Sequence, residues 1–228
     1  MRYCLGFLCL VVLTSANSIL AANLRIAGCD VVWSSPDDPS PTCYVMVFNE
    51  QGAADSLLGW QVHLVIVPVG EVTGSVQFAW ADLPRGSEEG YLLAGNSGVL
   101  DMPDPPDEPW IPGPVDELRL WDNTFDGNPI VVPESGKTLL KTSFSATPDA
   151  QGVFGIAVAA DPTGYDTGWA ASDYQMYGFE NAPDENEPVV IGQLTVGALV
   201  PEPGNFLFIC TALAMLAIRE LAPTVRRR

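Results

Sequence analysis

Basic side chains are scarce in this sequence. The 228 residues contain 10 Lys and Arg against 28 Asp and Glu, which gives a formal net charge of -18. Four of the ten basic residues lie within the last ten positions, so the rest of the chain carries no basic patch that could neutralise phosphate groups. Nucleic acid and anionic membrane surfaces are therefore excluded as partners, and the charge points to cations instead.

Histidine and cysteine are also rare. His63 is the single histidine and lies inside a predicted strand, so Ser-His-Asp and Cys-His mechanisms lack a suitable base and zinc lacks ligands. Two carboxylates suffice for glycoside hydrolysis, but no pair stands out among so many acidic residues. The sequence predicts a protein that is not an enzyme, with a carboxylate-dependent hydrolase as the remaining enzymatic alternative.

The first 22 residues have the layout of a secretory signal peptide. Arg2 precedes an apolar run from Tyr3 to Leu13, and small and polar residues follow as far as Ala22. Cleavage contexts at 16–18 and 19–21 leave the exact bond open, and an uncleaved anchor is the alternative. Residues 26–29 imitate a lipoprotein processing site, but the adjacent Arg25 argues against one.

The last 29 residues form a second distinct segment, 200–228. A 13-residue apolar run, 206–218, would rise about 20 Å as a helix, which is short of the roughly 30 Å hydrocarbon core and predicts a marginal membrane span. The positive-inside rule places its C-terminal end in the cytoplasm and the main domain outside. The residues that define this segment are Pro201, Glu202, Pro203, Arg219, Arg226, Arg227 and Arg228.

The order Pro-Glu-Pro, short apolar helix, terminal arginines resembles the PEP-CTERM sorting signal of exported bacterial proteins. The resemblance implies export, a pause in the membrane, and processing near 201–203 by an exosortase-like protease. It also implies association with exopolysaccharide or other surface proteins. The chain departs from the pattern because residues 220–225 separate the helix and Arg219 from the last three arginines. A permanent single-pass anchor is the alternative.

The exported domain, 23–199, is predicted to be an all-β antiparallel sandwich, either jelly-roll-like or of the type that the second resemblance below implies. It holds 26 acidic residues, all except Glu202 and Glu220, and five basic ones, a net charge near -21. Strand-like runs recur between Gly, Pro, Asn and Asp turns, and no segment has helical periodicity. Strands are expected at 24–33, 43–48, 60–67, 74–82, 91–94, 117–121, 130–132, 137–146, 152–160 and 189–196.

Two of these runs carry a second resemblance. Residues 57–66 and 139–146 are similar to paired central strands of cohesin-like sandwiches, which join exported carbohydrate-active assemblies. The similarity concerns pattern rather than unique residues, and function lives in sites grafted onto folds. It therefore implies a fold and assigns no ligand. Two long loops are predicted between the regularly spaced strands, at residues 101–114 and 161–186. Either loop is a candidate binding loop.

Cys29 and Cys43 are the two cysteines expected in the exported domain. They flank a turn-rich connector between two strand-like runs, so a disulfide would staple a hairpin. Two separately buried thiols are the alternative.

A calcium site is considered in the acidic loops. Asp122 to Gly127 matches the opening spacing of an oxygen-ligand loop, but Pro133 stands where a bidentate Glu belongs, so this is no EF-hand. The residues considered as calcium ligands are Asp101, Asp104, Asp122 and Asp126. No other cofactor is expected, and an acidic loop that is merely solvated is the alternative.

Aromatic residues gather among acidic ones in the second long loop. They are Tyr165, Trp169, Tyr174 and Tyr177. Flat apolar rings beside hydrogen-bond acceptors are the mixture on which sugar rings stack, and burial in the core is the alternative. The sequence thus predicts an exported surface protein, structural or adhesive and non-enzymatic, with a carbohydrate-binding module as the second hypothesis.

Overall fold

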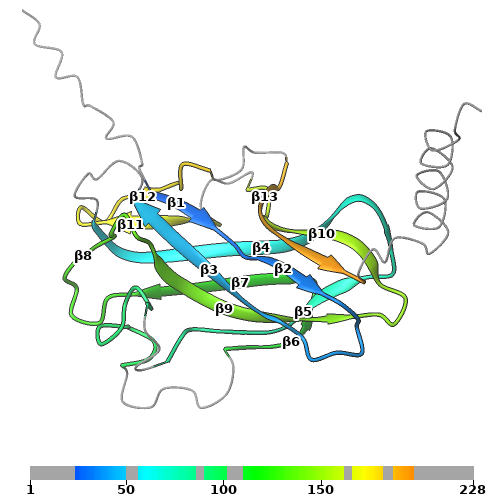
Figure 1. Cartoon of the computed structure of the whole chain (residues 1–228). Coiled ribbons are helices and arrows are strands. Elements are labelled where there is room, and N and C mark those ends of the chain that lie inside the picture. Colours follow the sequence, from blue (N-terminus) through cyan, green and yellow to red (C-terminus); the bar gives the residue numbers. More distant parts are fainter. Residues whose placement is uncertain are drawn as a thin grey trace, which may run out of the picture.

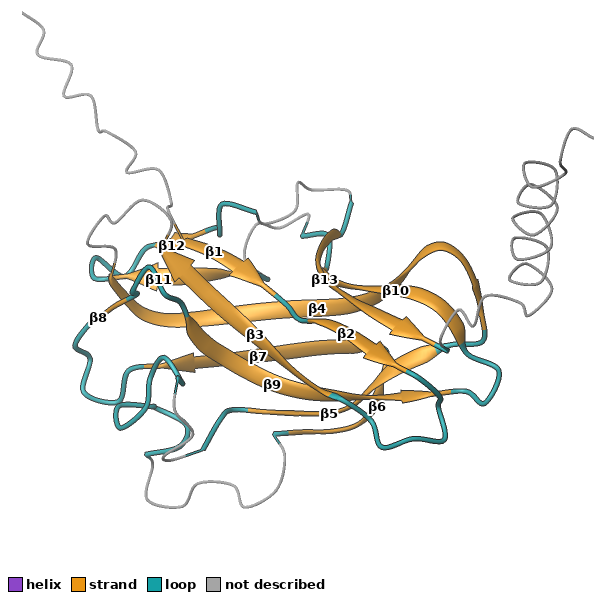
Figure 2. Cartoon of the chain, viewed as in Figure 1, coloured by secondary structure: helices purple, strands orange, loops and turns teal. Residues whose placement is uncertain are grey.

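The chain folds into two stacked β-sheets in a computed structural model, which describes residues 24–49, 56–85, 90–101, 110–161, 166–181 and 187–197. Figures 1 and 2 show long strands from both sheets running across one another. No helix able to cross a membrane occurs in these ranges. The predicted signal peptide, 1–22, and the C-terminal segment, 200–228, lie outside the described residues.

The smaller sheet has five antiparallel strands in the order β1-β3-β9-β5-β6. Its strands are β1 (Leu24–Ala27), β3 (Thr42–Asn49), β5 (Val76–Asp82), β6 (Ile111–Val115) and β9 (Lys137–Ala146).

The larger sheet has eight strands built around one long strand, β4 (Ser56–Thr73). β10 and β11 pair end to end along one side of β4, while β7 and β8 pair along the other. Beyond β10 lie β13 and then β2, and β12 pairs with β11. The remaining bounds are β2 (Asp30–Trp33), β7 (Glu117–Asn123), β8 (Ile130–Val131), β10 (Gln151–Val158), β11 (Gly168–Ala171), β12 (Met176–Tyr177) and β13 (Val189–Val196).

The core lies between the two sheets because alternate side chains of each strand point inward. β7 shows the pattern clearly: Leu118 and Leu120 are fully buried, while the residues between them are exposed. From the other sheet, Phe78 and Phe144 meet with ring centroids 6.1 Å apart. Burial of one face per sheet leaves the outer faces free to carry other side chains.

The predicted sandwich is confirmed, and two expected strands, 137–146 and 189–196, have the observed bounds. Other expectations were wrong. Residues 91–94 form turns with one isolated bridge, Tyr91 to Thr138. The expected loops contain strands: β6 begins within 101–114 and ends at Val115, and β11 and β12 lie within 161–186. The sandwich is also not wholly antiparallel, since β13 and β2 run parallel.

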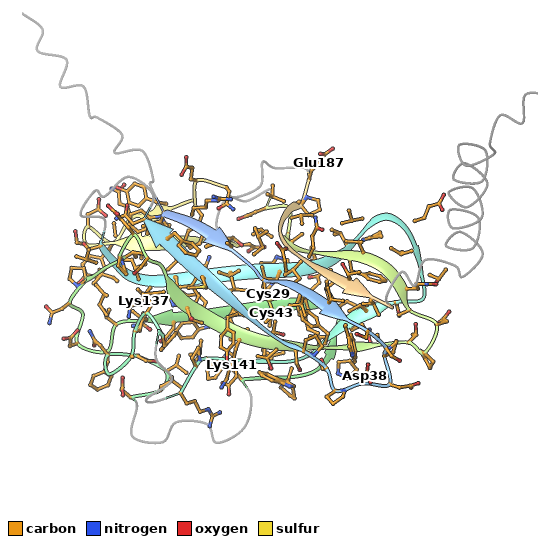
Figure 3. All side chains as sticks on the ribbon, in the orientation of Figure 1. Cys29, Asp38, Cys43, Lys137, Lys141 and Glu187 are labelled. Atoms are coloured by element: carbon orange, nitrogen blue, oxygen red, sulfur yellow. A yellow bond between two sulfur atoms is a disulfide. The ribbon has the colours of Figure 1, made fainter. Side chains whose placement is uncertain are left out.

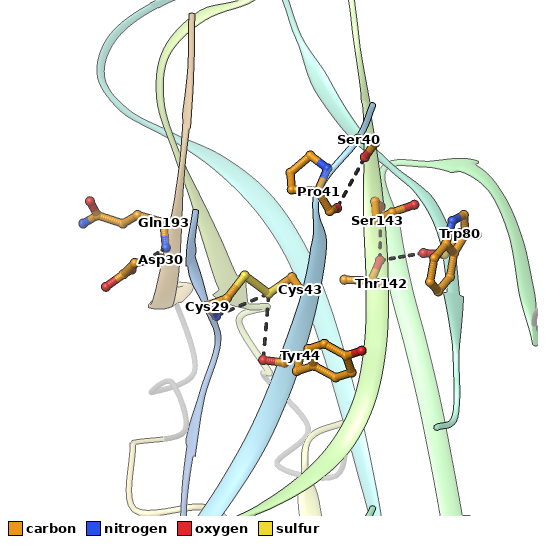
Figure 4. Close-up of a disulfide and its surroundings, with 10 residues drawn as sticks. All are labelled: Cys29, Asp30, Ser40, Pro41, Cys43, Tyr44, Trp80, Thr142, Ser143 and Gln193. Atoms are coloured by element: carbon orange, nitrogen blue, oxygen red, sulfur yellow. Dashed lines mark hydrogen bonds between the residues drawn. A yellow bond between two sulfur atoms is a disulfide. The ribbon is translucent and has the colours of Figure 1, made fainter. Parts of the chain in front are cut away.

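The disulfide between Cys29 and Cys43 is confirmed, but it does not staple a hairpin (Figures 3 and 4). Cys29 lies in the link between β1 and β2, which belong to different sheets, and Cys43 lies in β3. The two Cα atoms are 5.5 Å apart. The bond therefore ties the crossover between the sheets to the core, where the Cys43 side chain is fully buried.

Candidate functional site

A groove opens on the outer face of the eight-stranded sheet. Leu58 and Gly59 of β4 lie at its base with Ala170 of β11, and its volume is about 200 Å³. The loop after β7 borders it on one side and the turn between β11 and β12 on the other. Its bordering residues are Asn123, Thr124, Gly127 and Tyr174.

Small residues make this depression possible. A Cβ on Gly59 would lie 3.0 Å from both the Cβ of Asn123 and the carbonyl oxygen of Asp122, so β4 and β7 approach closely only because position 59 is glycine. Gly127 has a φ of 70° with no atom within 4 Å of a would-be Cβ. The groove is therefore open to solvent at Gly127, and glycine backbone lines it together with the side chains of the other bordering residues.

Tyr174 is held outward in the turn between β11 and β12. Its φ is 63°, in the left-handed region, and its side chain is 79% exposed. The turn is fixed because the amide of Tyr174 donates to the carbonyl of Ala171, and the amide of Gln175 donates to the carboxylate of Asp173. An exposed aromatic ring therefore stands at the edge of the groove.

The other predicted aromatic residues do not line the groove. Trp169 is 5% exposed and belongs to the core, as the alternative interpretation held. Tyr177 is half-buried and stacks on Trp169 with ring centroids 5.1 Å apart. Its hydroxyl donates to Asp173, and that hydrogen bond raises the pKa of Tyr177. Tyr165 lies outside the described residues.

Sequence reasoning missed three exposed apolar side chains near this site. Trp121 faces outward from β7 at 49% exposure, with its ring 6.4 Å from that of Trp110. Phe125 and Met176 are exposed in the neighbouring loop and strand. The sequence pattern could have predicted the exposure of Trp121. Trp121 alternates with Leu118 and Leu120 and therefore lies on the opposite face of β7.

Asp122, considered as a calcium ligand, points into the molecule and is 1% exposed. One carboxylate oxygen accepts from the hydroxyls of Tyr91 and Ser97, and the other accepts from the amides of Val99 and Asn123. Burial raises the pKa of the Asp122 carboxyl, against the lowering effect of these hydrogen bonds. The carboxylate thus fixes the 90–101 segment onto β7.

The other acidic residues considered for calcium also have protein partners. Asp126 is exposed and accepts from the amide and side chain of Asn128 and from the side chain of Asn96, which together lower its pKa. Asp101 accepts from the amide of Ser97, 2.6 Å away. Asp104 lies outside the described residues. Across the ranges that the structure describes, no group of three His, Cys, Asp or Glu residues is arranged to hold a metal ion.

His63 lies on the same outer face as the groove but is covered. Its Nε2 is 3.0 Å from the carboxylate of Glu117, and its Nδ1 is 3.6 Å from that of Asp166. Arg119 also pairs with Asp166, at 3.3 Å. The histidine therefore helps to attach Asp166 and Thr167 to β4 and β7, which is a structural role.

No protein-family model matches the sequence, and no curated protein matches it. Solved structures similar to the chain are cohesin modules. The seventh ScaB type I cohesin of Pseudobacteroides cellulosolvens is 11% identical, with a TM-score of 0.46, covering 78% of this chain and 95% of its own. The sixth cohesin of Acetivibrio cellulolyticus scaffoldin B, solved with a Cel5 dockerin mutant, is 8% identical, with a TM-score of 0.46, covering 76% and 99%.

A type III cohesin from the cell-surface anchoring scaffoldin ScaE of Ruminococcus flavefaciens is 12% identical, with a TM-score of 0.45, covering 78% of this chain and 89% of its own. Identities and scores of this size describe a shared course of strands and assign neither ligand nor partner to this chain. The chain is an all-β sandwich that is similar to these modules.

Proposed function

We propose that the chain is an exported, non-enzymatic surface protein with a structural or adhesive role, contacting other macromolecules of the cell surface through its β-sandwich. The observation that carries the proposal is the groove beside Tyr174, with the exposed Trp121 on the same sheet face. Solvent-exposed aromatic side chains gathered on one face are typical of interaction surfaces.

Two further features support display outside the cell. The disulfide suits an oxidising compartment, and it forms between the two cysteines that remain once the terminal segments are set aside. The sequence of the ends supports a signal peptide at 1–22 and a PEP-CTERM-like tail at 200–228 that an exosortase-like protease would process near Pro201 to Pro203. The helix at 206–218 would hold the chain in the membrane until then.

The hydrolase alternative finds little support at the groove. The carboxylate of Asp126 is held by Asn96 and Asn128, and that of Asp173 by Tyr177 and Gln175. Glycoside hydrolysis needs two carboxyl groups on either side of the bond that is cleaved, and no Asp or Glu is among the described residues that line the groove.

The export proposal is tested by intact mass and location of the protein in its host. We expect a chain that lacks the first 22 residues or so, ends near 201–203, and is found in the envelope matrix or the medium. A protein with both terminal segments retained and located in the cytoplasm would contradict it. A full C-terminus retained in the membrane would overturn the sorting and leave an anchored ectodomain.

A further inference from the structure

We propose that the groove between the 123–127 loop and Tyr174 binds one ring of a neutral polysaccharide chain, with the Trp121 indole as a second contact farther along the same face. The proposal rests on the proposed function and names the class of ligand at its surface. The argument comes from the shape of the groove, the aromatic side chains beside it, the polar groups at its edge and the charge of the domain.

The size of the groove suits one small unit of a larger ligand, such as one sugar ring. Its volume of about 200 Å³ is below the roughly 300 Å³ at which sites for drug-sized ligands begin, so it holds a small unit of a larger ligand. Gly59 and Ala170 carry almost no side chain, and Leu58 beside them gives the base an apolar surface. A chain can enter and leave along the sheet because the groove is an open surface feature.

The aromatic side chains supply stacking surfaces at two places. Tyr174 borders the groove, and its turn fixes the backbone that presents it. Trp121 lies on β7, two strands away from β11 with β4 between them. Trp121 lies opposite Gln61 of β4, whereas Ala171 of β11 lies opposite Leu57. Tyr174 follows Ala171 in the turn, so the two aromatic side chains are separated along the strands as well as across two inter-strand spacings of roughly 10 Å, and an extended ligand is needed to contact both. Aromatic faces stack on the apolar C–H faces of sugar rings.

Polar groups at the edge supply hydrogen bonds. Asn123 borders the groove, and the adjacent loop holds Asp126 in a fixed network with Asn96 and Asn128. On the other side, Asp173 is held by the Tyr177 hydroxyl and the Gln175 amide. Fixed carboxylate and amide oxygens accept from hydroxyl groups, which a sugar offers at nearly every carbon.

The negative charge of the domain favours uncharged polysaccharides over anionic ones. The exported domain carries a net charge near -21, and two acidic residues, Asp126 and Asp173, directly precede Gly127 and Tyr174, which line the groove. Chains rich in uronic acid or sulfate would be repelled, and no cationic group borders the groove to offset that repulsion among its described residues. The ligand is therefore neutral.

The test compares binding of the protein, as isolated from its host, to insoluble and soluble neutral glucans, mannans and galactans and to an anionic alginate. We expect retention on at least one neutral polysaccharide and none on alginate. Tyr174→Asn should lower affinity at least tenfold, because Asn tolerates the left-handed backbone but offers no ring. Trp121→Ala should weaken binding to long chains more than to short oligosaccharides.

Tyr44→Ala is the matched control, since Tyr44 is an exposed aromatic side chain on the five-stranded sheet. It should bind as the unaltered protein does, and circular dichroism should show all variants folded. Equal loss in Tyr44→Ala and Tyr174→Asn, or binding to alginate alone, would overturn the proposal. A third outcome is that the protein binds no glycan, while Tyr174→Asn still releases it from its native matrix. This outcome would overturn the proposal that the ligand is a polysaccharide and would leave the proposed adhesive function intact.

Discussion

At the scale of single residues, Asp122 is a buried acidic side chain that joins two parts of the fold. It accepts four hydrogen bonds while 1% exposed, and its partners come from the 90–101 segment and from β7 itself. A buried carboxylate is tolerated only where hydrogen bonds replace water. The spacing that suggested a calcium loop therefore places this Asp inside the molecule.

Replacing Asp122 by Ala should destabilise the protein by roughly 3 kcal/mol, because two hydroxyls and two amides lose their acceptor in a buried site. Asp126→Ala, an exposed carboxylate in the following loop, should cost clearly less. Urea unfolding of both variants measures the difference. Equal stability of Asp122→Ala and the unaltered protein would show that the network contributes nothing.

The raised pKa of Asp122 predicts a pH dependence. A folded-state pKa above the unfolded one means that the folded state binds the proton more tightly, so this stabilisation is complete below about pH 4 and is lost as pH rises through the folded pKa. Asp122→Asn does not titrate. The stability of the unaltered protein relative to Asp122→Asn should therefore be greater at pH 4 than at pH 7, as measured by urea unfolding. A relative stability that increases with pH would contradict this.

At the scale of elements, alternation of side chains predicted the long, regular strands well. Lys137–Ala146 and Val189–Val196 have clear inward and outward faces, and both were predicted with the observed bounds. β6 was missed because Pro112 and Pro114 suggest a loop, although prolines fit at a sheet edge, where β6 lies. β11 and β12 were missed because β11 acquires its pairing from β4 and β12 acquires its pairing from β11, and no local pattern encodes either contact.

The candidate site could be predicted only in part for the same reason. Tyr174 was only one of four candidate aromatic residues in the sequence, and the sequence pattern could not distinguish this exposed ring from the buried Trp169 five positions earlier. That distinction depends on the turn after β11 and on contacts with the core. The groove itself joins β4, β11 and the loop after β7, which lie far apart in the sequence.

The disulfide is the clearest stabilising feature between elements. It closes a separation of 14 residues, for which loop-closure entropy suggests about 3 kcal/mol. Cys29→Ser with Cys43→Ser should lower the free energy of unfolding by about that amount, because the crossover from β1 to β2 is then held only by pairing. Thiol titration of the denatured, unreduced protein is the companion measurement, and two free thiols would contradict the bond.

At the scale of the whole molecule, the residues that stabilise the fold and the residues proposed to bind other material lie in different parts of the sandwich. The core and the disulfide fix both sheets, and the outer face of the larger sheet is left to carry Tyr174, Trp121 and the groove between β7 and β11. The strong negative charge keeps the domain soluble and away from polyanions. These properties together fit a displayed module that holds other surface material without acting on it chemically.

Retention on isolated surface matrix tests this account most directly. Protein purified from the host would be added to matrix from cells that lack it, alongside the double variant Trp121→Ala with Tyr174→Asn and the control Tyr44→Ala. We predict that the unaltered protein and the control are retained and that the double variant is released into solution while still folded. Equal retention of all three proteins would contradict an adhesive role for this face of the sandwich.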